Sequence, residues 1–178
     1  MRIGVHLANW GTATGSVERI TALAGAAEDL GFDSVWVTDH VVIPDEFTSP
    51  YPVPGLSHNP DTAEMTYEPI VTLAVVAGAT RRVGLGTSAL ISAQRNPLVT
   101  VKELTTLDVL SGGRLEVGLG AGWLAEEFAV LGAPPFAERG AVLDEHIAVF
   151  RAFWNDERPS YDGTYTSFPT LRFEPRPV

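Results

Sequence analysis

Apolar and polar positions along the chain form blocks that predict a repeated strand–helix unit. Residues 3–9 are apolar and β-rich, which predicts a strand. A helix is expected over residues 16–30, because apolar side chains recur on one face at helical spacing and Ser16 can cap the first turn. Gly31 is the expected stop, and the short apolar run 34–38 predicts the second strand.

The alternation then repeats, with one long interruption. Residues 41–66 are rich in Pro, Ser, Asp and Asn, and a connection of that length in a compact domain is typically functional or mobile. The last segment, residues 160–178, predicts an excursion with a small hairpin around Asp162-Gly163 rather than a fifth unit. The remaining elements are predicted as helix 67–80, strand 83–92, helix 97–110, strand 114–120 and helix 136–154.

Four βα units in strict alternation predict an α/β fold with a parallel sheet, because parallel neighbours need helical crossovers. Three of the strands carry apolar residues with little alternation, as buried parallel strands do. We expect a single domain over residues 1–178. Two architectures fit this pattern: half of a (β/α)8 barrel, or an open doubly wound sheet.

Composition narrows the class of protein. The chain has 178 residues, 45% of them hydrophobic, which is a globular composition. A formal net charge of −10 argues against nucleic acid as a partner, because phosphate binding needs clustered Lys and Arg. No apolar run is long enough to cross a bilayer, and the first residues lack a secretory layout. Because cysteine is also absent, the expected location is the cytoplasm.

Polar and glycine residues gather where the predicted strands end, which is where parallel α/β folds place their functional groups. His40 can act as a general acid or base, since imidazole titrates near neutrality, and Asp39 can orient it. The alternative is an Asp-His pair that caps the strand end and satisfies loop amides. With polar residues at the other strand ends as well, we favour the functional interpretation.

Three glycines stand at alternate positions at the fourth strand end: Gly118, Gly120 and Gly122. Lacking Cβ atoms, they would let a phosphate or a flat ring approach the backbone. Tight strand–helix packing without a ligand is the alternative. The spacing of a dinucleotide-binding loop fails, because Trp123 stands where its third glycine would be.

Other side chains carry weaker signals. Arg95 precedes a predicted helix and either binds a phosphate or pairs with Glu103 or another surface acid, the commoner case for a lone arginine. Glu126 and Glu127 are interpreted as part of a solvated helical turn. Trp123 is placed where an aromatic ring could wall a planar ligand. No spacing typical of metal ligands is present, so no metal is expected.

Several of these motifs, in this order, resemble the signature of the luciferase-like monooxygenase family. They are residues 39–44, 86–88, 107–114, 118–123 and 126–128. The resemblance covers essentially the whole chain and is greatest to the branch that uses the deazaflavin coenzyme F420. It implies a (β/α)8 TIM barrel, of which this chain would cover about the first four βα units, the C-terminal half being absent.

The resemblance also implies a site at the C-terminal rim of the barrel. His40 and Asp39 would be catalytic, with the histidine serving proton transfer beside the ring. A non-prolyl cis peptide would lie behind the ring at Ser88-Ala89, and the loop after the fourth strand would hold the cofactor tail. The residues assigned to cofactor binding are Asp39, Thr87, Ser88, Ala89, Gly120, Ala121, Gly122 and Trp123.

The function implied is an oxidoreductase that transfers a hydride between reduced coenzyme F420 and an organic substrate. An FMN-dependent monooxygenase of the same fold is the near alternative. Sugar-phosphate dehydrogenases of the family carry a catalytic glutamate where this chain has Trp123, which argues against that activity. A barrel needs about 250 residues, so this chain would pair as a homodimer or need the C-terminal half. A non-catalytic half-barrel that associates with another chain is the third alternative.

Overall fold

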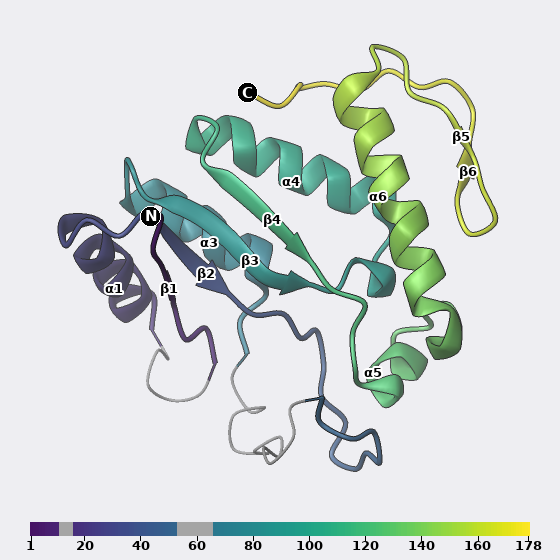
Figure 1. The fold of residues 1–178 in the computed structure, drawn as a ribbon, viewed down its shortest axis with the longest axis horizontal. Helices are drawn as coiled ribbons and strands as arrows, with labels where there is room; N and C mark the ends of the chain where they lie inside the picture. The colour runs from purple at the N-terminus through teal and green to yellow at the C-terminus, as the bar shows by residue number, and fades with distance from the viewer. Residues whose placement is uncertain (11–15, 53–65) are drawn as a thin grey trace.

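The computed structural model describes residues 1–10, 16–52 and 66–178, and its centre is a four-stranded parallel sheet (Figure 1). The strands lie side by side in chain order, each paired with the next. A doubly wound sheet would reverse this order at a switch point, so the order is that of a barrel. The strands are β1 (Gly4–His6), β2 (Ser34–Val37), β3 (Gly84–Leu90) and β4 (Leu115–Leu119).

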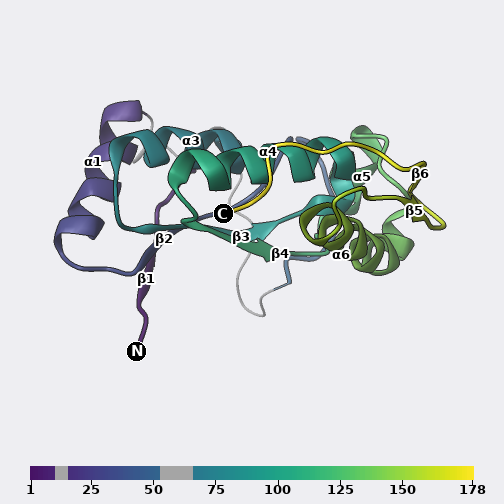
Figure 2. The same ribbon diagram turned by 90° about the horizontal axis from the view of Figure 1, so that it is seen from above.

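Helices cover one face of this sheet. Figure 2 shows α1, α3 and α4 as a layer on one side, while α6 packs against α4 beyond the end of the sheet. A short helix, α5, follows β4, where the sequence predicts only a helical turn around Glu126 and Glu127. The bounds are α1 (Val17–Asp29), α3 (Pro69–Ala79), α4 (Pro97–Ser111), α5 (Ala125–Val130) and α6 (Arg139–Asn155), with 3-10 turns η2 (Ser92–Gln94) and η3 (Phe136–Glu138).

Local chemistry explains where the helices begin and end. The Ser16 hydroxyl accepts the amide of Arg19, so the predicted cap of α1 is confirmed. The Asn96 side chain accepts two amides of the first turn of α4, whose first residue is Pro97. Gly112 ends α4 in the left-handed conformation (φ 74°), where a side chain would be strained.

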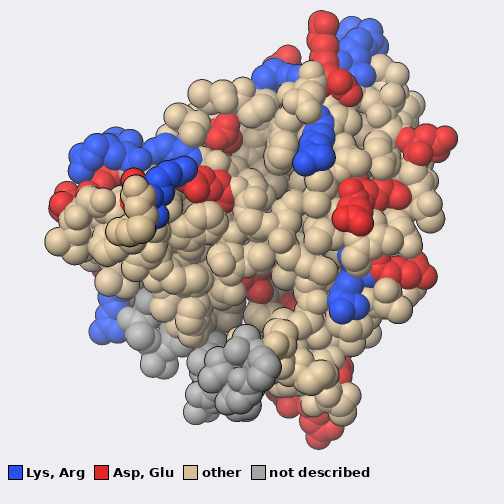
Figure 3. Space-filling model, viewed as in Figure 1, with Lys and Arg blue, Asp and Glu red and all other residues tan. Residues whose placement is uncertain are grey.

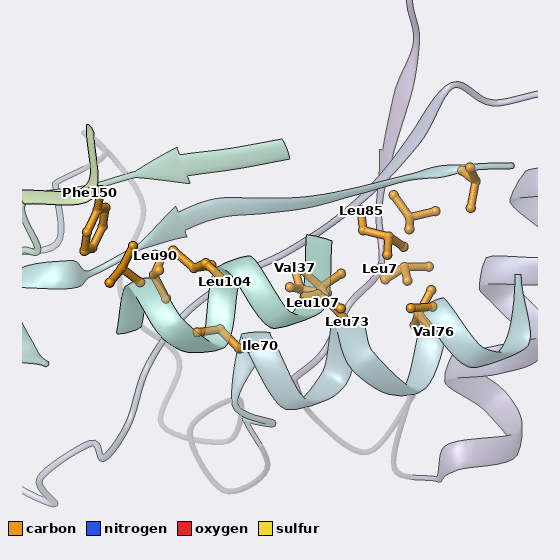
Figure 4. Packing of buried hydrophobic residues seen from close by; sticks show 14 of the residues in the cluster. Leu7, Val37, Ile70, Leu73, Val76, Leu85, Leu90, Leu104, Leu107 and Phe150 are labelled. Carbon is orange, nitrogen blue, oxygen red and sulfur yellow. The ribbon is translucent and has the colours of Figure 1, made fainter. Parts of the chain in front are cut away.

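The hydrophobic core lies between the sheet and its helix layer. Side chains of Val37 and Leu85 from the strands meet Leu73 of α3 and Leu104 of α4, and all four are completely buried (Figure 4). This burial removes most apolar strand residues from water on one side, which is the main stabilising contribution to the fold. It also holds the ends of β2 and β3 in fixed positions.

The opposite face of the sheet has no helix layer (Figure 2). The Trp36 side chain lies across it, in space that Cβ atoms on Gly4 or Gly86 would overlap. Figure 3 looks onto this face and shows that its middle is largely uncharged. In a closed barrel this face would be the packed interior, filled by inward-pointing side chains of alternate strands.

At the N-terminal ends of the strands, one carboxylate organises a turn. Glu28 accepts the backbone amides of Arg81, Arg82 and Val83. Burial raises its pKa, but these three amides and the charge of Arg82 outweigh that effect and lower the pKa to about 2.

The C-terminal hairpin and the long connection after β2 are the two remaining segments that the sequence singled out. The hairpin expected around Asp162 is confirmed, since β5 (Tyr161–Asp162) and β6 (Ser167–Phe168) pair antiparallel. The long connection 41–66 is described only up to residue 52, and residues 53–65, like the predicted loop 11–15, lie outside the described residues.

Within the described ranges, no helix is both long and apolar enough to span a bilayer.

Candidate functional site

The C-terminal ends of β2, β3 and β4 are joined by direct contacts. The amide of Ile91, just after β3, donates to Asp39 after β2 at 2.7 Å. A Cβ placed on Gly120, after β4, would lie 3.0 Å from the Cβ of Ala89 in β3. His40 and Trp123 have ring centroids 5.8 Å apart. The predicted site residues therefore come from three strand ends and lie together.

Asn9 links the end of β1 to this group. Its Nδ2 donates to the carbonyls of Thr38 and Tyr67, both at 2.8 Å, and its Oδ1 accepts the amide of Thr38 at 2.9 Å. The residue is fully buried. Its polar atoms therefore hold β1, β2 and the start of α3 together.

Asp39 forms a buried ion pair with Arg95. The guanidinium binds both carboxylate oxygens, Nη1 to Oδ2 at 2.7 Å and Nη2 to Oδ1 at 2.8 Å. The Asp39 side chain is 0% exposed and that of Arg95 is 13% exposed. Arg95 also forms an ion pair with Glu68 at 3.3 Å. Of the two roles considered for Arg95, the structure therefore shows ion pairing, and its partners are Asp39 and Glu68 rather than Glu103.

His40 is oriented by a different acid from the one expected. Its Nδ1 lies 3.0 Å from Oε2 of Glu127, and no bond to Asp39 is found among the described contacts. Oε1 of Glu127 accepts the amides of Val41 at 2.7 Å and Val42 at 3.1 Å. The expectation that Asp39 orients His40 is wrong, because the Asp39 carboxylate is committed to Arg95.

Glu127 was also wrongly expected to be solvated. Its side chain is 1% exposed, and α5 aims it at the end of β2. Burial raises its pKa, but hydrogen bonds from His40, Gln94 and Val41, together with the charge of His40, lower it overall. A carboxylate in this setting is ionised and acts only as an acceptor.

Glu126, the neighbouring acid of α5, binds the next part of the same connection. It accepts the backbone amide and the hydroxyl of Thr48, and the amide and the hydroxyl of Ser49. These bonds, led by the Thr48 amide and the Ser49 hydroxyl, lower the pKa of Glu126 to about 2. Two successive acids thus fasten residues 41–49 to α5.

Trp123 forms an aromatic cluster over this connection. Its indole meets His40, Phe47 and Tyr51 edge-to-face, at centroid distances of 5.8, 5.9 and 5.2 Å. Edge-to-face contacts between aromatic rings are favourable, so they hold these four side chains in fixed relative positions. The sequence-based expectation that Trp123 could wall a planar ligand stays a prediction, and the cluster places the ring between the β2 and β4 ends.

The end of β3 contains the expected cis peptide between Ser88 and Ala89. Pairing with β4 is interrupted here, since Thr87 and Leu90 have partners and the two residues between them do not. Ser88 is exposed. Thr87 is fully buried, and its hydroxyl bonds the backbone of Gly118, so it shapes the strand end from within.

Packing accounts for the three glycines of the β4 end. A Cβ on Gly118 would collide with the backbone of Thr87, and one on Gly122 would lie 2.7 Å from the Phe128 ring. Gly122 also has φ 82°. The Gly120 position faces Ala89, as described above. The glycine pattern therefore follows from packing, and contact of residues 120–123 with a cofactor stays a prediction.

A groove of about 1020 Å³ lies between α3 and α4 and borders the site, because Val41, Gln94 and Arg95 are part of its lining. Its walls are mainly helix side chains such as Val71, Val99 and Leu110. It includes neither His40 nor the residues of the β4 end. The polar groups that can do chemistry are at the strand ends, so the candidate site is there and not in this groove.

Comparison with known proteins agrees with this geometry. Residues 1–178 match the family described as luciferase-like monooxygenase. An uncharacterized protein of Mycobacterium tuberculosis is 35% identical over 158 residues, which are 88% of this chain and 56% of that protein. The F420-dependent glucose-6-phosphate dehydrogenase of Amycolatopsis mediterranei is 34% identical over 154 residues, 85% of this chain and 42% of that enzyme.

Solved structures show the same fold. Monooxygenase RslO1 from Streptomyces bottropensis superposes with a TM-score of 0.80 at 28% identity, over 99% of this chain and 50% of that one. The coenzyme F420 dependent tetrahydromethanopterin reductase of Methanopyrus kandleri gives 0.73 at 22% identity, over 99% and 46%. The chain spans about half the length of these relatives and has the fold of half their barrel. It belongs to the luciferase-like monooxygenase family.

Proposed function

We propose that the protein containing this chain is an F420-dependent oxidoreductase that transfers a hydride between the coenzyme and an organic substrate. The observation that carries the proposal is the convergence of three strand ends: His40 after β2, Ser88-Ala89 in β3 and residues 120–123 after β4. In parallel barrels this rim is where cofactors and substrates bind.

The chemistry of these residues fits a flavin-like ring. Ser88 and Ala89 lack ladder partners in β4, and the Ser88 side chain is exposed, so the side of β3 toward β4 is open at this point and can meet the edge of a ring. Trp123 offers an aromatic wall at the same rim. We propose that Asp39, Thr87 and residues 120–123 complete the binding site, with Asp39 and Thr87 acting from buried positions.

When bound, the coenzyme would supply the ring carbon that gives or accepts a hydride. His40 is proposed to hold the proton that a substrate heteroatom gains or loses as the hydride moves at the adjacent carbon. Its imidazole is 15% exposed, so one part of the ring reaches the rim while Nδ1 is held inside by Glu127. That is the arrangement expected of a general acid or base.

The choice of F420 rests on the curated relatives. Enzymes named F420-dependent glucose-6-phosphate dehydrogenase are 34–37% identical over most of this chain. We do not propose glucose 6-phosphate as substrate, because the resemblance places a catalytic glutamate in those enzymes where this chain has Trp123. The substrate would enter beneath the connection that follows β2.

An FMN-dependent monooxygenase is the second candidate. One relative of known structure, monooxygenase RslO1 from Streptomyces bottropensis, supports it with a TM-score of 0.80 and 28% sequence identity. The site residues described above suit either ring, because none of them distinguishes a nitrogen from a carbon at the reactive ring position.

We also propose that activity needs more than these four βα units. The face with Trp36 has no helix layer, and β4 is half-buried along its length. A second half-barrel, from the same polypeptide or from a second copy, would cover both. Without it the chain would be the non-catalytic alternative.

Equilibrium titration tests the proposal. The protein expressed from its complete gene is titrated with coenzyme F420 and, separately, with FMN, and ligand fluorescence reports binding. We expect saturable F420 binding that is tighter than FMN binding. Tight FMN binding with no F420 binding would overturn the proposed cofactor and favour the monooxygenase.

A further inference from the structure

We propose that Glu127 is the positioning residue of His40: it fixes the proton on Nδ1 and so makes Nε2 the nitrogen that exchanges protons. This inference rests on the proposed role of His40 and adds a residue to it. Glu127 lies 87 positions away in the chain, on a six-residue helix, and reaches His40 at 3.0 Å.

The donors around the Glu127 carboxylate carry the argument. Oε1 accepts the amides of Val41 at 2.7 Å and Val42 at 3.1 Å. Oε2 faces Nδ1 of His40. An ionised carboxylate has no proton to donate, so the hydrogen of the Oε2–Nδ1 bond must come from the imidazole. The neutral ring is therefore protonated on Nδ1.

Glu127 also fixes the backbone beside the histidine. The two amides that it accepts belong to the residues directly after His40. Ring and main chain are thus held by one buried side chain, with the edge of Trp123 against the imidazole. A neutral ring in this setting presents Nε2 as an acceptor.

The substitution Glu127→Gln makes this arrangement testable. The amides of Val41 and Val42 require an acceptor, so they would hold the amide oxygen of the glutamine in place of Oε1. The NH2 group would then face Nδ1 and force the imidazole proton to Nε2. Replacing a carboxylate by an amide behind a catalytic histidine in this way costs about 10⁴-fold in turnover in a well-studied hydrolase triad.

Glu126→Gln is the matched control. It removes the same charge from the adjacent position of α5, and its contacts are to Thr48 and Ser49 rather than to His40. Nitrogen-15 NMR of the protein from its complete gene, labelled at histidine and free of cofactor, reports which ring nitrogen carries the proton. We expect Nδ1–H for His40 in the wild type and in E126Q, and Nε2–H in E127Q.

Kinetics completes the test. We expect E127Q to lower kcat by about 10³-fold or more, with cofactor affinity unchanged, and E127D to restore Nδ1–H and part of the turnover. An Nε2–H tautomer in the wild type, or the same tautomer and turnover in E127Q, would overturn the inference. The wild-type tautomer decides even if E127Q fails to fold. Failure of the proposed catalytic role of His40 is a separate outcome, and it would be seen as unchanged turnover in H40A.

Discussion

Replacing Arg95 with alanine should destabilise the protein strongly, because it leaves the Asp39 carboxylate buried without its counter-ion. Asp39 is 0% exposed and receives two charged hydrogen bonds from Arg95. Only the amide of Ile91 would remain as a donor among its described contacts. Removing one member of a buried pair costs about 3–5 kcal/mol, and we expect a loss of that size.

Two further variants separate charge from geometry. Arg95→Lys keeps a cation but cannot bind both oxygens at once, so it should cost about 1.5–3 kcal/mol, the value of one charge-assisted hydrogen bond. Adding Asp39→Asn to Arg95→Ala removes the unpaired charge and should recover part of the loss. The two residues are in contact, so their effects should not add.

Urea denaturation at pH 7, without cofactor, gives the free energy of unfolding of each variant. We expect the wild type to be the most stable and Arg95→Ala the least stable. Arg95→Lys and the double variant should lie between them, in either order. A loss below about 1 kcal/mol in Arg95→Ala would refute the ion pair as the anchor of the β2 end. So would a double variant that is less stable than Arg95→Ala.

Three other predictions concern the site and the turns. His40→Ala should lower kcat by about 10²–10⁴-fold and leave cofactor affinity nearly unchanged; steady-state kinetics with unaltered turnover would remove His40 from the mechanism. Gly122→Ala should cost about 1–3 kcal/mol, measured by urea denaturation, because of its positive φ and the nearby Phe128 ring. Glu28 has a folded pKa of about 2, so its contribution to stability is present above pH 4.5 and lost as the pH falls toward 2. Glu28→Gln should therefore lose less stability between pH 6 and pH 3 than the wild type, and equal losses would contradict the assignment.

Much of the fold could be predicted from the sequence because its signals are local. Apolar runs marked the four strands, and the capping residue Ser16 and the stop residue Gly31 marked the two ends of α1. The predicted helix 67–80 is observed as Pro69–Ala79. The family motifs, in order, also located the strand ends and the cis peptide at Ser88-Ala89.

What the sequence did not reveal depends on contacts between distant segments. Arg95 and Asp39 are 56 positions apart, so their pairing could not be predicted from spacing. Helix α5 is six residues long, too short for a periodic pattern, and Glu127 on it resembles any acid of a solvated turn. Only the packing of α5 against the β2 end buries Glu127 and turns it toward His40.

The central claim is that the rim formed by the β2, β3 and β4 ends is a cofactor site. A crystal structure of the protein from its complete gene, soaked with coenzyme F420, tests it most directly. We expect the deazaflavin ring to lie against Ser88-Ala89 and residues 120–123, with the His40 imidazole beside it and Nδ1 of His40 still bonded to Glu127. A ring bound elsewhere, for example in the groove between α3 and α4, would contradict it.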